Sequence, residues 1–321
     1  MITVEHLSKR YGSTAAVEDV TFSVEEGEIL GFLGPNGAGK TTTMRILTGY
    51  MPPSQGHVKI AGYDVLAESL RVRQRIGYLP ETPPLYPDMT VLGYLDFVAR
   101  IKGVNAGDRP ARLQAALRRC GLADRQTTLI RKLSKGFRQR VGIAQAIVHD
   151  PPVIILDEPT VGLDPQQIIQ VRNLIKSLAG SHTLVLSTHI LPEVEMTCDR
   201  VVIIQKGRVV AADTVANLES QRTAGLGYEL RVAGDLQSLT TALRQIPGVE
   251  QASCTPLDGE MGMVAVYGRP GLDLGPQLAS TAVGLGVQLY ELRQQRASLE
   301  DVFLQLTTEE RIMPAAGEED R

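Results

Sequence analysis

The residues best suited to chemistry stand in a glycine-rich segment near the start of the chain. Gly34, Gly39, Lys40 and Thr41 match the pattern G-x-x-x-x-G-K-[ST] between an apolar run and a helical pattern. In this pattern backbone N–H groups curl around phosphates, the lysine meets the β and γ oxygens, and the hydroxyl coordinates Mg²⁺. A helix that starts at Thr41 adds its positive end. The segment therefore predicts a nucleotide site with Mg²⁺, formed by Gly34, Pro35, Asn36, Gly37, Ala38, Gly39, Lys40, Thr41 and Thr42.

A pair of acidic residues follows a second apolar run. Val153–Leu156 is typical of a buried strand, and Asp157 and Glu158 stand at its end. Asp157 is placed there to hold Mg²⁺, and Glu158 to polarise an attacking water as a general base. Alone, an apolar run that ends in Asp-Glu is more often only the end of a strand. Together with the phosphate loop, it predicts the hydrolytic half of a nucleotide site.

A third candidate surface begins another predicted helix. The Ser134 hydroxyl, the Gly136 backbone and the start of the helix would form an anion-binding surface. An N-capping serine before a basic amphipathic helix explains the same residues, and without the neighbouring motifs that interpretation is favoured.

The elements around these motifs follow an α/β pattern. Across residues 1–220, short apolar runs alternate with helical patterns, and the unbroken runs are typical of strands buried on both faces. Between Asp88 and Gln126 the pattern becomes helical, so we expect a sheet interrupted by a helical insert at about residues 88–150. The predicted strands are Val20–Val24, Glu28–Leu33, Val153–Leu156, Thr183–Ser187 and Val201–Gln205.

A polar, glycine-rich stretch at Glu219–Gly227 predicts a linker between two domains, 1–221 and 222–310. The second domain is expected to be a small α+β unit, ferredoxin-like by element order. It closes on a helix over Leu299–Thr307, and residues 311–321 are predicted to be disordered. Its other predicted elements are strands at Tyr228–Val232, Met261–Tyr267 and Val287–Leu292, and helices at Leu236–Leu243 and Leu274–Val283.

The order of the motifs resembles that of the ATP-binding subunits of ABC (ATP-binding-cassette) transporters over about residues 1–220. Gly34–Thr41 matches the Walker A motif, Val153–Asp157 matches Walker B, and Leu133–Gln139 matches the family signature. The resemblance implies a P-loop NTPase cassette with a mixed sheet core and a helical subdomain. It also implies ATP and Mg²⁺ as cofactors.

The resemblance assigns expected roles to single residues. Tyr11 matches the aromatic residue that stacks on adenine, and Glu158 matches the catalytic glutamate. Asp164 stands in the D-loop, and His189 matches the switch histidine that contacts the γ-phosphate. Without the family match, Tyr11 and His189 would be ordinary packing residues.

Two departures from the usual family sequence affect the site. Glu81 occupies the position of a glutamine that senses the metal and the attacking water, so we expect its carboxylate near Mg²⁺. Lys135 and Phe137 replace Gly and Gln in the signature, where Ser134 and Gly136 remain. These departures resemble the exporter branch that works with type-2 (ABC-2) permeases.

The resemblance implies an ATP-hydrolysing motor subunit of an ABC-2 type exporter, bound at the cytoplasmic face of the membrane. Ser134 and Gly136 of one copy and Walker A of another would enclose each ATP, which predicts a homodimer. Hydrolysis would drive a separate integral-membrane permease. The proline-rich stretch 82–90 is its candidate dock, although a rigid surface loop explains that stretch equally well. The second domain is expected to regulate or stabilise dimerisation.

Composition narrows the alternatives. Lys and Arg number 33 against 36 Asp and Glu, a formal charge of −3 that argues against a nucleic-acid partner. Three distant cysteines favour a reducing compartment. The chain shows neither an apolar run of about 18 residues nor the apolar core of a signal peptide. Two rivals remain open: a soluble cassette ATPase of DNA repair or translation, and a nucleotide-gated module that does not hydrolyse ATP.

Overall fold

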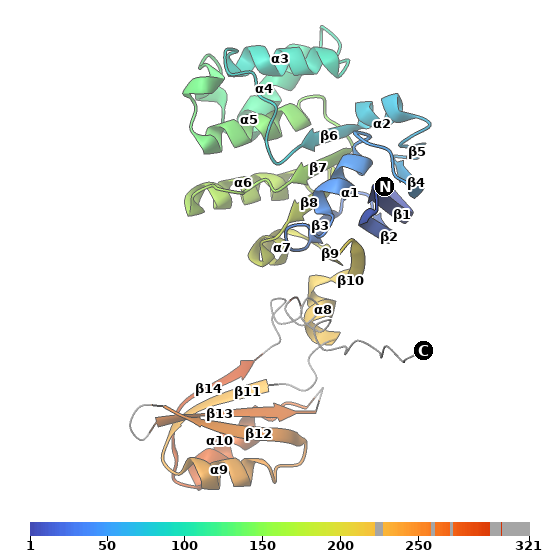
Figure 1. Ribbon diagram of the computed structural model, residues 1–321. Coiled ribbons are helices and arrows are strands. Elements are labelled where there is room, and N and C mark those ends of the chain that lie inside the picture. Colours follow the sequence, from blue (N-terminus) through green and yellow to red (C-terminus); the bar gives the residue numbers. More distant parts are fainter. Residues whose placement is uncertain (222–226, 258–260, 270–271, 296–302, 304–321) are drawn as a thin grey trace, which may run out of the picture. The chain divides into compact units, whose positions relative to one another are not determined.

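The computed structural model describes residues 1–221, 227–257, 261–269, 272–295 and Phe303 of the 321-residue chain (Figure 1). The chain divides into two compact units, Met1–Val215 and Ala216–Arg321. The division falls at the beginning of helix α8 (Val215–Gln221), whereas the sequence pattern places the boundary after this helix. Within the described ranges, every helix is too short or too polar to cross a lipid bilayer.

A six-stranded sheet forms the centre of the first unit, with the strand order β10-β9-β3-β8-β7-β6. All neighbours are parallel except β9 and β10, which are antiparallel. Every residue of β3, β7 and β8 is buried, which explains why these strands are unbroken apolar runs in the sequence. The strands are β3 (Ile29–Leu33), β6 (Ile76–Leu79), β7 (Val153–Asp157), β8 (Thr183–Thr188), β9 (Arg200–Gln205) and β10 (Arg208–Thr214).

A second, antiparallel sheet has the order β2-β1-β4-β5. Its inner side packs with the central sheet in one core, where the rings of Phe22 and Phe32 lie 5.4 Å apart. Outward polar residues alternate with buried ones along β1, so its sequence carries no continuous apolar run. The strands are β1 (Ile2–Tyr11), β2 (Thr14–Val24), β4 (Gln55–Ile60) and β5 (Tyr63–Asp64).

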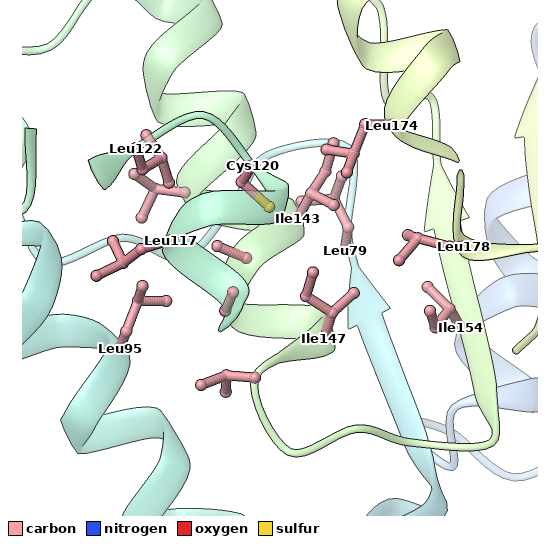
Figure 2. Close-up of a cluster of buried hydrophobic side chains, with 14 of the residues drawn as sticks. Leu79, Leu95, Leu117, Cys120, Leu122, Ile143, Ile147, Ile154, Leu174 and Leu178 are labelled. Carbon is pink, nitrogen blue, oxygen red and sulfur yellow. The ribbon is translucent and has the colours of Figure 1, made fainter. Parts of the chain in front are cut away.

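The expected helical insert is built from α3, α4 and α5, which gather beside β6 (Figure 1). Thr90 caps α3 by accepting a hydrogen bond of 3.1 Å from the Gly93 N–H. Figure 2 shows Leu95 of α3 and Leu117 of α4 in the same apolar cluster as Leu79 of β6. The insert therefore shares its core with the sheet. Its helices are α3 (Val91–Ile101), α4 (Arg109–Arg119) and α5 (Lys135–Ile147), with 3₁₀ turns at Ala123–Arg125 and Ile130–Lys132.

The remaining helices of the first unit connect its strands. Leu174 and Leu178 of α6 reach the same cluster as Ile154 of β7 (Figure 2). These helices are α1 (Lys40–Leu47), α2 (Ser69–Arg75), α6 (Pro165–Leu178) and α7 (Leu191–Thr197).

The second unit is an antiparallel sheet with the strand order β12-β13-β11-β14. Its element order is β-α-β-β-α-β, and the apolar residues of α9 and α10 share one core with the sheet. The predicted helix Leu299–Thr307 and the tail 311–321 lie outside the described residues, apart from Phe303. The elements are β11 (Gly227–Ala233), α9 (Leu236–Leu243), β12 (Val249–Pro256), β13 (Met261–Gly268), α10 (Gly275–Gly284) and β14 (Gln288–Gln295).

Lys102, at the end of α3, ties the helical insert to β6 and gives the fold a testable pH dependence. Its Nζ donates hydrogen bonds to the carbonyls of Arg73 (2.8 Å) and Ile76 (3.0 Å). Burial, assisted by the nearby charge of Arg73, lowers the pKa of Lys102 to about 8, against roughly 10.4 in an unfolded chain. Between these values the unfolded state binds more protons at Lys102, so the contribution of Lys102 to the free energy of unfolding should rise from pH 8 to 9.5. The buried thiols of Cys120 and Cys198 contribute with the opposite sign, because burial raises their pKa.

Urea denaturation of wild type and Lys102→Met at several pH values isolates the Lys102 contribution, because both proteins keep the same cysteines, and the free energy of unfolding should change less favourably with rising pH in Lys102→Met. Lys176→Met, at an exposed lysine of α6, is the control. The same slope in wild type and Lys102→Met would contradict the assignment. Measurements should stop below pH 10, because burial also raises the pKa of Tyr94, to about 12.

Candidate nucleotide-binding site

The candidate site lies where three parallel strands of the central sheet end. Leu33 pairs with Thr188 at the end of β3 and β8, and Asp157 pairs with Ser187 at the end of β7. The Gly34 N–H donates to the Thr188 carbonyl over 3.4 Å, so the glycine loop starts beside the residue that precedes His189. The carboxyl ends of strands are where open α/β sheets bind ligands.

The loop between β3 and α1 requires its glycines. Gly37 and Gly39 have φ of 82° and 106°, in the left-handed region that favours glycine. A Cβ on Gly34 would overlap the Ile204 carbonyl, and one on Gly39 would lie 2.6 Å from the Ala16 carbonyl. The backbone curls tightly here and leads into α1, whose first N–H groups lack partners within the helix. Such a loop can surround phosphate oxygens.

Lys40 lies inside this loop and is only 6% exposed. Its Nζ donates to the carbonyls of Gly34 (2.8 Å) and Pro35 (3.3 Å) and lies 3.4 Å from Glu158 Oε1. The structure thus brings together the predicted phosphate-binding lysine and the predicted general base. Thr41 and Thr42 follow it in the first turn of α1.

Glu158 occupies a strained backbone position directly after β7. Its φ is 50°, a left-handed conformation that costs a residue with a side chain about 1–3 kcal/mol. The Glu158 N–H donates to the Ser187 carbonyl over 2.9 Å, which holds this turn against the end of β8. Its carboxylate oxygens lie 2.9 and 3.0 Å from His189 Nδ1. Lys40, Glu158 and His189 therefore form one polar cluster.

Asp157 has the features of a cation ligand. It is fully buried, and neither carboxylate oxygen makes a hydrogen bond of ordinary geometry within the described part of the chain. Burial raises its pKa, and the Glu158 and Glu81 charges add to this, while the Ser187 and Thr41 hydroxyls oppose it. A buried carboxylate beside two hydroxyl oxygens, with no hydrogen bond of ordinary geometry, fits Mg²⁺.

The protein ligands available at this position suit a Mg²⁺ ion that is also bound by the phosphates of a nucleotide. Among the described residues, no three His, Cys, Asp or Glu side chains converge into a cage for a metal. Mg²⁺ normally binds one or two carboxylates together with phosphates and water, so a single buried carboxylate suffices. Glu81 is exposed beyond the end of β6, and its charge reaches Asp157. It is thus electrostatically coupled to the metal position that the sequence predicts for it.

Tyr11 ends β1, and the residue is 48% exposed. Its hydroxyl donates to Met51 Sδ over 3.1 Å, and Lys9 Nζ lies 5.6 Å from the ring centroid. The strand that follows carries Ala16, whose carbonyl approaches Gly39. The hairpin with the predicted adenine-stacking residue therefore adjoins the phosphate loop.

The signature and D-loop residues form a separate surface. Ser134 caps α5 by accepting a hydrogen bond of 3.4 Å from the Phe137 N–H. Asp164 caps α6 by accepting one of 2.9 Å from the Gln167 N–H, and the Gln167 amide packs so closely on Gly136 that a Cβ would overlap it. In the described part of the chain, no polar contact joins Ser134 or Asp164 to the Lys40 cluster.

Sequence reasoning missed Glu193 of α7. This carboxylate is 3% exposed and accepts hydrogen bonds from the hydroxyls of Thr160 and Thr188. A glutamate in a short polar helix carries no sequence signal of burial, because only the fold brings both threonines to it.

A glycine loop before a helix, a buried carboxylate for a cation and a positioned glutamate define a P-loop nucleotide hydrolase. The family model described as "ABC transporter" matches residues 17–161. The linearmycin resistance ATP-binding protein LnrL of Bacillus subtilis is 32% identical over 96% of this chain and 98% of its own. The Nod factor export ATP-binding protein I of Ralstonia nicotianae is 34% identical over 97% of this chain and 94% of its own.

A similar solved structure contains the products of ATP hydrolysis. The dimeric structure of a post-hydrolysis state of an ATP-binding cassette, bound to ADP and Pi, is 26% identical with a TM-score of 0.61. The similarity covers 67% of this chain and 98% of the cassette. The chain belongs to the family of ABC transporter ATP-binding proteins, and it is an ATPase.

Lys40→Ala should abolish productive ATP binding, because the ammonium group inside the loop is the group placed to meet the β and γ oxygens. Binding of a fluorescent ATP analogue and the rate of phosphate release measure the effect. Lys59→Ala, at an exposed lysine of β4, is the control. Unchanged affinity and turnover in Lys40→Ala would refute the assignment of the site.

Proposed function

We propose that this ATPase is the motor subunit of an ABC-2 type exporter, a homodimer that encloses two ATP molecules and drives a separate permease. The observation that carries the proposal is the separation, within one chain, of the Ser134–Gly136 surface from the Lys40 cluster. Both surfaces suit phosphate. In a dimer, the Ser134–Gly136 surface of one subunit can complete the nucleotide site around Lys40 of the other subunit. The similar cassette with ADP and Pi is itself dimeric. Two relatives are named for linearmycin resistance and for Nod factor export, which supports export.

The geometry suggests a division of labour in hydrolysis. The loop amides and Lys40 bind the β- and γ-phosphates, and Thr41 and Asp157 would hold Mg²⁺ with Glu81 nearby. When bound, Mg²⁺ neutralises charge that develops on the phosphate oxygens. Glu158 accepts the proton of the attacking water, and His189 orients the Glu158 carboxylate through its Nδ1 contact. Tyr11 offers its exposed ring to adenine.

A groove beside this site is the proposed dock for the permease. It has a volume of about 460 Å³ and runs from Glu81 past Pro83 and Leu85 to Lys135. The loop 82–90 contributes Thr82, Pro83, Leu85 and Pro87 to one wall. Tyr86 of the same loop is half exposed, and its ring lies 5.8 Å from that of Tyr94. Arg131, Lys135 and Arg138 line the other side, so an amphipathic segment with acidic residues would fit. A permease segment in this groove would contact both Glu81, near the expected Mg²⁺, and Lys135 of the signature. Contact with both would couple movement of the permease to ATP binding and hydrolysis. The subunit would then be peripheral at the cytoplasmic face of the membrane.

The second unit is proposed to regulate or stabilise the dimer. It has its own apolar core and contributes none of the residues of the Lys40 cluster. A unit of about a hundred residues is marginal in stability unless it packs on a further surface. The matching unit of a second subunit would supply such a surface in the dimer.

Glu158→Gln should retain ATP binding but slow hydrolysis by about 10²–10⁴-fold, because the amide cannot accept the proton. The ATP-bound dimer should then accumulate, which light scattering detects. Asp199→Asn, at a carboxylate that accepts from the Ile29 N–H away from the cluster, is a matched control. Normal turnover in Glu158→Gln would show that another group activates the water, and a monomer with ATP bound would contradict the dimer.

Tyr86→Ala should weaken binding to the permease at least about 10-fold, because its half-exposed ring stands between two groove residues, Leu85 and Pro87, and truncation of an aromatic anchor commonly costs about 2 kcal/mol. Detergent extracts of membranes provide the measurement, as the amount of integral protein that co-purifies with the tagged subunit. ATPase activity of the isolated subunit should remain within about twofold. Ile101→Ala, at an exposed apolar residue of α3, is the control. Equal recovery with Tyr86→Ala would place the dock elsewhere.

A further inference from the structure

Glu193 connects the two segments that carry the hydrolytic residues. It lies in the first turn of α7, is 3% exposed, and accepts from the Thr160 hydroxyl through Oε1. Its Oε2 accepts from the Thr188 hydroxyl over 2.7 Å. Thr160 and Thr188 are themselves buried, at 4% and 0% exposure. A single carboxylate therefore bridges two loops within the protein interior.

Each of the two threonines adjoins one hydrolytic residue along the chain. Thr188 is the last residue of β8 and immediately precedes His189, and its hydroxyl also accepts a hydrogen bond from the Ile190 N–H (3.1 Å). Thr160 stands two residues after Glu158, in the turn that leads to the D-loop, and its carbonyl accepts from the Leu163 N–H (3.1 Å). The Glu193 bridge thus spans from the Glu158 turn to the His189 turn.

The turn at Glu158 needs such external support. A φ of 50° is unfavourable for glutamate, and residues in such positions persist only where their surroundings hold them. Two backbone hydrogen bonds brace the turn, from the Glu158 N–H to Ser187 and from the Val161 N–H to the Glu158 carbonyl (3.3 Å). The hydrogen bond from the Thr160 hydroxyl to Glu193 adds a side-chain brace to the same turn. This brace therefore supports the position of Glu158, whose carboxylate contacts His189.

A carboxylate is an expensive group to bury for packing alone. Buried charges are costly unless they are paired or hydrogen-bonded, and the bonds described for Glu193 are those from the Thr160 and Thr188 hydroxyls. The two hydroxyls provide the compensation, and they give the carboxylate two directional bonds that an apolar side chain could not make. Those bonds fix the distance between the Thr160 and Thr188 segments.

We propose that Glu193 is a positioning residue for ATP hydrolysis. Through its hydrogen bonds to Thr160 and Thr188, it fixes the position of Glu158 relative to His189. The proposal rests on the role proposed above for Glu158 as general base. Because Glu193 contacts neither the glycine loop nor Lys40, its effect falls on the hydrolytic step and spares nucleotide binding.

Glu193→Ala should lower kcat by about 10–100-fold, since small displacements of a catalytic group have effects of that size. KM and the affinity for a non-hydrolysable ATP analogue should stay within about twofold. Glu193→Gln should restore part of the rate, because an amide can accept from one hydroxyl and donate to the other. Glu195→Ala, at an exposed residue of the same helix, should leave kcat unchanged.

Thr160→Val is an independent test of the Thr160–Glu193–Thr188 bridge. It removes one hydroxyl with little change of side-chain shape, so it remains informative even if Glu193→Ala fails to fold. It should lower kcat, and Thr160→Val combined with Glu193→Gln should be less than additive. A parallel loss of ATP affinity, equal rates in Glu193→Ala and Glu193→Gln, or an unaffected Thr160→Val would overturn the proposal.

A double variant separates this proposal from the role of Glu158. If Glu193 acts through Glu158, Glu158→Gln combined with Glu193→Ala should be no slower than Glu158→Gln alone. A further loss in the double variant would overturn the positioning role. Full activity of Glu158→Gln would instead refute the general base, whatever the effect of Glu193→Ala.

Discussion

The in-register parallel pairing of β7 with β8 is the constraint on which the site depends. Asp157 pairs with Ser187, and the Glu158 N–H continues the ladder to the Ser187 carbonyl. A slip of one residue would exchange the two faces of the strand and separate Glu158 from His189. Complete burial of both strands fixes the register, because any slip would move polar residues of the strand ends into the apolar core.

Electrostatics makes this arrangement receptive to a nucleotide. Asp157 and Glu158 are adjacent buried carboxylates, and burial together with the Glu158 charge raises the pKa of Asp157. Lys40 lies near Glu158 and bonds to two loop carbonyls, which are neutral acceptors that a phosphate can replace. A cation at Asp157 and phosphates at Lys40 would each satisfy groups that the protein alone satisfies incompletely. ATP with Mg²⁺ supplies both at once, so the two are expected to bind together.

The sequence predicts the buried strands and the phosphate loop well, because complete burial and glycine geometry both constrain residue type. The P-loop cassette fold and membership of the ABC transporter ATP-binding family are confirmed by the solved cassettes and the relatives. β1 and β12 escaped prediction because each is half exposed, with polar residues between the buried ones. Glu193 could not be predicted, since its role depends on two threonines that only the completed sheet brings near it.

The unusual signature has a structural explanation within one chain. The amine of Lys135 packs so closely on Gly162 that a Cβ there would overlap it, and Gly162 also has a φ of 69°. The guanidinium groups of Arg125 and Arg140 lie 5.5 and 5.3 Å from the centroid of the Phe137 ring. Both departures therefore add contacts around the start of α5, and Lys135 places its charge against the D-loop. Since Ser134 still caps that helix, its N-terminus retains the polarity that suits a phosphate of a second subunit.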